Sequence, residues 1–288
     1  MAEIALYRDV LRALSAVPEG QSAWPGFLEH VFYAHRAYFE GLVATYGQEP
    51  FDPGGIPGTL DRQAVALVRA LAPAPSYGME AEASRLLDRV SPLLPGTRPN
   101  LYLAVLFFIA PAATLSVLGR PAIALGLERF TPTPPAGGPK FWYHPSEAAE
   151  MVPHEAAHVA RMQVLKLPPS PRHLTLLDMM MLEGTALTFT DQLLGRQTLA
   201  TFMPSDQLAW HEAHQGQVWQ AVQPELGRTG MDVFTQYFGA NAPVSGYFAG
   251  YGLCREYLRR FGQHCMRELV AMPSLEILRR LAGGGGQP

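Results

Sequence analysis

Apolar and polar residues recur with helical spacing near the N-terminus. The stretch "EIALYRDVLRALSAV" has apolar residues at intervals of three and four, which is typical of an amphipathic helix. The same spacing recurs in residues 24–47, 60–72 and 79–94. A loop rich in proline and glycine, residues 49–58, separates two of these stretches. Residues 1–95 are therefore expected to form an N-terminal helical region.

The pattern changes in the middle of the chain. Residues 99–119 carry no charge and are long enough to span a membrane as a helix. Pro111 interrupts this run, no basic cluster flanks it, and a second apolar run follows at residues 120–130. Two or three buried strands explain both runs, and "KFWYH", residues 140–144, is a further strand candidate. We favour the strands and expect no membrane partner.

From Ser146 onward the spacing is helical again, in the stretches 146–165, 173–195, 205–222, 244–262 and 273–283. Helices, then strands, then helices indicate an α+β fold, mostly helical with a small mixed or antiparallel sheet. We predict a second domain over residues 96–282. The glycine-rich residues 283–288 are expected to form a disordered tail.

Charge and cysteine content limit the partners and the compartment. The net charge is −3, so the basic surface that nucleic-acid binding requires is not expected. Two cysteines do not make a disulfide scaffold, which fits a reducing compartment. The first helix lacks the basic-then-apolar order of a signal peptide, so a cytoplasmic location is expected. The sequence leaves the oligomeric state open.

The stretch "HEAAH" carries the most specific chemistry. His154 and His158 are four residues apart, so a helix places both imidazoles on one face, where they can bind one Zn²⁺. Glu155 points about 100° away from His154 around the helix axis, beside the coordination position that the protein ligands of a catalytic zinc leave open. There its carboxylate can take a proton from the attacking water and pass it to the leaving amine. The spacing is that of the metalloprotease motif H-E-x-x-H.

A catalytic zinc needs a third protein ligand, and Glu183 is the candidate. It is the single carboxylate in the apolar run Met179–Leu187, where a buried carboxylate is costly unless it is paired or bound to a metal. Two antiparallel helices joined by residues 166–173 would bring Glu183 opposite the histidines. Asp191, two turns further on, is a candidate for orienting a ligand histidine. One Zn²⁺ per chain is expected.

"HEAAH" followed by "EGTA" resembles the gluzincin metallopeptidases, in which the glutamate of the second motif is the third zinc ligand. The chain is more similar to an uncharacterised bacterial family of predicted zinc-dependent proteases that adds a late G-Y-x-x-G-Y segment, here residues 246–251. The likeness covers roughly residues 100–260. It implies a zincin-like pair of active-site helices and a strand bordering the cleft at residues 119–128. The implied zinc ligands and base are His154, His158, Glu183 and Glu155.

Two other groups of residues have both functional and structural interpretations. Tyr247 and Tyr251 share a helix face, so either phenol could donate to the oxyanion of a tetrahedral intermediate, or both could pack in the core. Gly246 and Gly250 would let their helix approach another one closely. His211 and His214 are three residues apart in a polar stretch, which indicates a solvated helix. The alternative is that one of these histidines donates to the oxyanion.

These residues predict a zinc-dependent peptidase that acts on peptide or protein substrates, with Glu155, Tyr247 and Tyr251 as catalytic residues. The alternative is a non-peptidase or inactive zinc-binding protein that acts as a regulator. Glu155 argues against this alternative, because a structural zinc site has no use for a base. The sequence leaves open whether ends or interiors of substrates are cleaved. Glu128, at the end of the strand taken as the edge strand, is the one candidate for holding a substrate's amino group.

Overall fold

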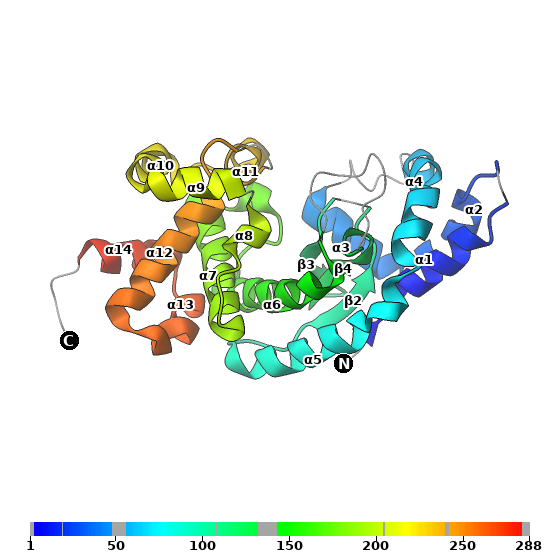
Figure 1. The fold of residues 1–288 in the computed structure, drawn as a ribbon, viewed down its shortest axis with the longest axis horizontal. Helices are drawn as coiled ribbons and strands as arrows, with labels where there is room; N and C mark the ends of the chain where they lie inside the picture. The colour runs from blue at the N-terminus through cyan, green and yellow to red at the C-terminus, as the bar shows by residue number, and fades with distance from the viewer. Residues whose placement is uncertain are drawn as a thin grey trace. The chain divides into compact units, whose positions relative to one another are not determined.

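The computed structural model describes residues 3–18, 20–47, 56–107, 109–131, 143–203, 205–239 and 242–283. It is a mostly helical α+β protein with a four-stranded mixed sheet, which confirms the predicted fold class (Figure 1). The chain divides into one compact unit of Met1–Val90 and Thr97–Glu155 and another of Ser91–Gly96 and Ala156–Pro288. Compact units are not evidence of independent folding, so the domain boundary at residue 95 stays a prediction.

The helices of the first unit begin and end close to the predicted positions. They are α1 (Leu6–Ser15), α2 (Trp24–Phe27), α3 (Arg36–Tyr46), α4 (Ile56–Leu71) and α5 (Met79–Val90). The expected continuous helix over 24–47 is wrong, because a π-helical turn at Leu28–Phe32 and a turn at residues 33–35 separate α2 from α3. The expected helix start at Glu3–Ile4 is also wrong. These residues form strand β1, whose backbone groups pair with the sheet.

The sheet contains β1 (Glu3–Ile4), β2 (Asn100–Ala104), β3 (Ala112–Val117) and β4 (Arg120–Gly126) in the order β1-β2-β4-β3. β3 runs antiparallel to β4 and the other pairs are parallel. A tight turn with positive φ at Leu118 and Gly119 joins β3 to β4. The apolar run 99–119 is therefore two strands and their connection. No helix among the described residues has the length and apolarity that a membrane span requires.

The edge of the sheet differs from the prediction. The strand predicted to lie at the edge is β4, but β4 has β2 on one side and β3 on the other. The edge strand beside β4 is therefore β3. Glu128 lies beyond β4, is fully buried, and accepts a hydrogen bond from the backbone N–H of Leu106 at 2.7 Å. Its carboxylate is therefore not presented to solvent for a substrate's amino group. Residues 140–142 of the expected aromatic strand and 284–288 of the expected tail lie outside the described residues.

Helices make up the second unit, which shares α6 (Ala148–Leu165) with the first because the division falls after Glu155. α7 (Leu176–Leu194) begins at Thr175, whose side chain accepts from the Asp178 N–H, and ends at Gly195 in the left-handed conformation. The remaining helices are α8 (Leu199–Phe202), α9 (Ser205–Ala213), α10 (Gln215–Val222), α11 (Met231–Phe238), α12 (Gly246–Phe261), α13 (Met266–Ala271) and α14 (Ser274–Ala282).

Helices α7 and α12 pack side by side (Figure 1). Their backbones touch where Gly184 meets Gly250, because a Cβ added to either glycine would overlap backbone atoms of the other helix. For Gly250 the overlapping atom is the carbonyl oxygen of Met180. The expectation that Gly250 allows a close helix approach is confirmed. The crossing fixes α12 beside the residue that follows Glu183.

Candidate metal centre

Helix α6 carries all three defined residues of the H-E-x-x-H motif, and all three are buried. His154 is 2% exposed, Glu155 is 7% exposed and His158 is 6% exposed. The helix is continuous through Pro153, so the proline is an interior residue and not the first residue of the helix. A helix turns about 100° per residue, which puts the two imidazoles on one face and Glu155 beside them.

Helix α7 brings the third predicted ligand to the histidines. The Oε2 atom of Glu183 lies 3.4 Å from the Nε2 atom of His158. One ligand atom from each of His154, His158 and Glu183 can be chosen so that all three lie within 4.8 Å of one another. In the part of the chain that the structure describes, no other group of three or more histidines, cysteines and carboxylates has this property.

This donor set fits Zn²⁺. Two atoms bound to one Zn²⁺ at about 2.1 Å are at most about 4.2 Å apart, so the observed spacing requires only small side-chain rotations. Two imidazoles and one carboxylate are a donor set of catalytic zinc sites, where three protein ligands leave a fourth position open. Burial also favours binding, because an enclosed carboxylate beside imidazoles is stabilised by a cation.

Glu155 is held by a residue that the sequence did not single out. The Thr114 hydroxyl donates a hydrogen bond to Oε2 of Glu155 at 2.8 Å. Thr114 belongs to the edge strand β3, so the sheet fixes the orientation of the carboxylate. No motif surrounds Thr114 in the sequence, and only the packing of β3 against α6 identifies it.

The predicted catalytic tyrosines have structural partners. The Tyr251 hydroxyl donates to Oδ2 of Asp191, and burial followed by this contact raises the pKa of Tyr251. Tyr247 is partly buried and packs against the rings of Phe202 and Phe238. The structure thus pairs Tyr251 with Asp191, and it places Tyr247 in an aromatic cluster. The oxyanion roles of both tyrosines stay predictions.

Asp191 does not orient a ligand histidine, so that expectation is wrong. Its Oδ1 atom accepts hydrogen bonds from the backbone N–H of Thr198 at 2.7 Å and from the Thr198 hydroxyl at 2.8 Å. Its Oδ2 atom accepts from Tyr251. The carboxylate therefore ties the segment after α7 to α12.

The interpretation of His211 as a solvated residue is also wrong. His211 is 1% exposed, and its Nε2 atom accepts a hydrogen bond from the backbone N–H of Ser245 at 2.9 Å. Its Nδ1 atom therefore carries the proton and donates to the Gln207 carbonyl at 2.7 Å. His211 holds the first turn of α12, and His214 stacks on Trp210. Neither histidine belongs to the metal cluster.

A buried arginine anchors α6, the helix that carries the two candidate histidine ligands. Arg161, three residues after His158, is fully buried and donates to the carbonyl oxygens of Leu269, Val270 and Met272 at 2.9–3.2 Å. It also donates to the Ser274 hydroxyl at 2.9 Å. Burial lowers the pKa of Arg161 to about 10, which still leaves it charged at neutral pH. In the sequence, Arg161 looks like an ordinary surface cation of an amphipathic helix.

Comparisons with known proteins agree with this site. Residues 142–279 match the model of a family described as "Predicted Zn-dependent protease (DUF2268)". The match includes the H-E-x-x-H motif, Glu183 and the segment 246–251, so it confirms the expected likeness to an uncharacterised family of predicted zinc proteases. The four-stranded sheet lies outside the matched residues. No curated protein and no solved structure gave a significant match to the chain.

Proposed function

We propose that this protein is a zinc-dependent peptidase that binds one Zn²⁺ per chain and hydrolyses peptide bonds. The observation that carries the proposal is that His154, His158 and Glu183 approach one point. Glu155 lies next to His154 on α6, the helix of both histidines. The family description supports the same class of reaction. Peptides or proteins are accordingly the proposed substrates.

Each residue of the site has a distinct role in the proposed reaction. His154, His158 and Glu183 would hold the zinc, which supplies a Lewis acid that polarises a carbonyl and lowers the pKa of water. The Glu155 carboxylate accepts a proton from the attacking water and later donates it to the nitrogen of the leaving amine. Thr114 engages one carboxylate oxygen of Glu155, which leaves the other oxygen available for that proton.

The gluzincin class and the oxyanion donor are finer parts of the proposal. A glutamate on the helix that follows the motif helix, in place of a third histidine, supports the gluzincin class. For the oxyanion we favour Tyr247, on the ground of its position on α12. Tyr247 lies one turn before Gly250, the point where α12 touches the residue next to Glu183.

The proposal is tested by measuring zinc content and peptide cleavage on the same preparations. The wild-type chain should contain about one zinc by elemental mass spectrometry and should cleave members of a peptide library. Glu155→Gln should keep the zinc and lower kcat by about 10²- to 10⁴-fold, because it removes the base without removing a ligand. Glu40→Gln, an exposed change on α3, is the matched control and should alter neither quantity.

Two results would contradict the proposal in different ways. A wild-type chain that takes up no zinc when zinc is supplied would exclude the metal centre. A chain that binds zinc tightly but cleaves no library peptide would favour the non-peptidase regulator.

A further inference from the structure

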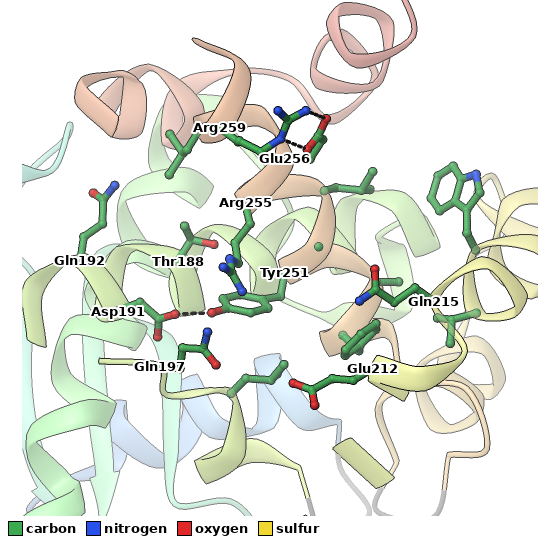
Figure 2. A pocket seen from close by; sticks show the side chains of 18 of the residues that line it. Thr188, Asp191, Gln192, Gln197, Glu212, Gln215, Tyr251, Arg255, Glu256 and Arg259 are labelled. Atoms are coloured by element: carbon green, nitrogen blue, oxygen red, sulfur yellow. Dashed lines mark hydrogen bonds and ion pairs between the residues drawn. The ribbon is translucent and has the colours of Figure 1, made fainter. Parts of the chain in front are cut away.

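A second site is formed by another face of α7. A pocket of about 700 Å³ lies between α7, α9, α10 and α12, within the size range of small-molecule sites (Figure 2). On α7 it is lined by Thr188, Asp191 and Gln192, which lie about 80–180° around the helix from Glu183. None of the proposed zinc ligands lines it, and neither does Glu155. We call it the Arg255 pocket.

Apolar side chains form one part of the lining. Leu199, Val218 and Leu258 are buried, and Phe248 lies with them. Trp219 of α10 adds a partly exposed aromatic ring. This part of the pocket suits an apolar side chain of a ligand.

Arg255 is held in the pocket without a carboxylate partner. Its guanidinium lies over the ring of Tyr251, 5.4 Å from the ring centroid, as Figure 2 shows. The hydrogen bond to Asp191 fixes that ring in turn. Arg259 and Arg260, on the same helix, both pair with Glu256 at 2.6 Å, whereas Arg255 forms no ion pair with any described residue. The guanidinium donors that Tyr251 does not engage are available to bind a carboxylate.

Glu212 supplies the opposite charge from α9. Its carboxylate has no hydrogen bond or ion pair with another residue in the described ranges, and the same is true of the side-chain amides of Gln197 and Gln215. Figure 2 shows Gln197 and Glu212 below the ring of Tyr251, Gln215 to its right and Arg255 above it. One cation, one anion and two amides with unused hydrogen-bonding capacity therefore line a single pocket.

The charges decide between classes of ligand. The pocket is lined by two arginines and three carboxylates, so a simple anion would meet a net negative charge. A ligand with both signs of charge can pair with Arg255 and Glu212 together.

We propose that the Arg255 pocket binds a short peptide or amino acid with free termini. Arg255 binds its carboxylate, Glu212 binds its ammonium group, and the two glutamine side chains bind a peptide amide. The ligand's side chain packs on Leu199, Val218 and Phe248. This inference goes beyond the proposed peptidase, because no zinc ligand takes part in it.

The test is calorimetric titration of the full chain with dileucine. The Glu155→Gln protein is used so that hydrolysis does not consume the ligand, and the N-acetylated and C-amidated forms of dileucine are titrated in parallel. Dileucine should bind, and blocking either terminus should weaken binding at least about tenfold. Arg255→Gln and Glu212→Gln should each weaken binding by about the same factor. The exposed changes Arg267→Gln on α13 and Asp206→Asn on α9 lie outside the pocket and should leave binding unchanged.

Three results would overturn the inference. One is the absence of saturable binding at millimolar dileucine. A second is equal binding of the N-acetylated form together with no effect of Glu212→Gln, which would indicate a carboxylate site only. A third is binding that Glu183→Ala abolishes and the two pocket variants do not change, which would place the ligand at the metal centre. Failure of the peptidase proposal would show instead in zinc content and cleavage, so the two failures are distinguishable.

Discussion

The candidate metal centre and the Arg255 pocket lie on different faces of α7, and their polar side chains differ in how far they are buried. His154 and His158 are almost fully buried, and Glu183 lies partly buried beside them. Arg255 and Glu212 are exposed to water, which solvates them without any ion-pair partner. Three side chains of the types that zinc prefers, gathered at one point, therefore indicate a metal directly. The exposed charges of Arg255 and Glu212 indicate a ligand only because both line one pocket and neither forms an ion pair with a described residue.

The largest expected effect is the loss of zinc affinity when Glu183 is replaced, and it distinguishes the metal centre from the Arg255 pocket. Glu183→Ala should lower zinc affinity by more than about 100-fold, because it removes a ligand and not merely an outer partner of one. Competition with a chromogenic chelator measures the change. Glu212→Gln is the matched control and should bind zinc as the wild type does. Wild-type zinc affinity in Glu183→Ala would mean that the third ligand is another residue.

The helix crossing is expected to affect both sites at once. Gly250→Ala should lower the free energy of unfolding by about 2 kcal/mol, because the added Cβ overlaps the carbonyl oxygen of Met180. Gly252→Ala is the control on the same helix, where an added Cβ has no neighbour within 4 Å. The control should raise stability by about 0.5–1 kcal/mol, since alanine is the better helix former. Equal urea midpoints for the two variants would contradict the close contact between α7 and α12.

A smaller effect is expected where the sheet contacts the base. Thr114→Val keeps the shape of the side chain but removes the hydroxyl that donates to Glu155. It should lower kcat about tenfold with zinc content and KM unchanged, as loss of an orienting partner does. Thr114→Ser restores the hydroxyl and should recover most of the activity. An unchanged kcat in Thr114→Val would show that Glu155 is oriented without this bond.

The smallest effect concerns Tyr251, which the sequence assigned to the metal centre and which lines the Arg255 pocket. Tyr251→Phe removes the hydrogen bond to Asp191 and should lower the free energy of unfolding by about 1 kcal/mol in urea titrations. We expect kcat of the proposed reaction to stay unchanged. A fall in kcat of about 100-fold at constant KM would instead support the oxyanion role.

Local features of this protein were readable from its sequence, because they depend on interactions between residues close in the chain. The spacing of apolar residues located most helices, and Gly195 marked the end of α7. The geometry of a helix alone puts His154 and His158 on one face. The errors at Glu3–Ile4 and at residues 24–47 arose where pairing with the sheet or a π-helical turn replaced the helix that the local pattern favoured.

Tertiary packing decided everything that joins distant segments. The sequence named Glu183 as a candidate, but its 3.4 Å distance from His158 depends on how α6 and α7 pack. Thr114 and Arg161 have no sequence signal, because a strand threonine and a helix arginine are usually solvated, and only their partners show otherwise. The same holds for His211, which looks exposed in its polar stretch and is buried against Ser245. A polar side chain acquires its role from what surrounds it, and for these residues the surroundings come from segments 25 to 113 residues away.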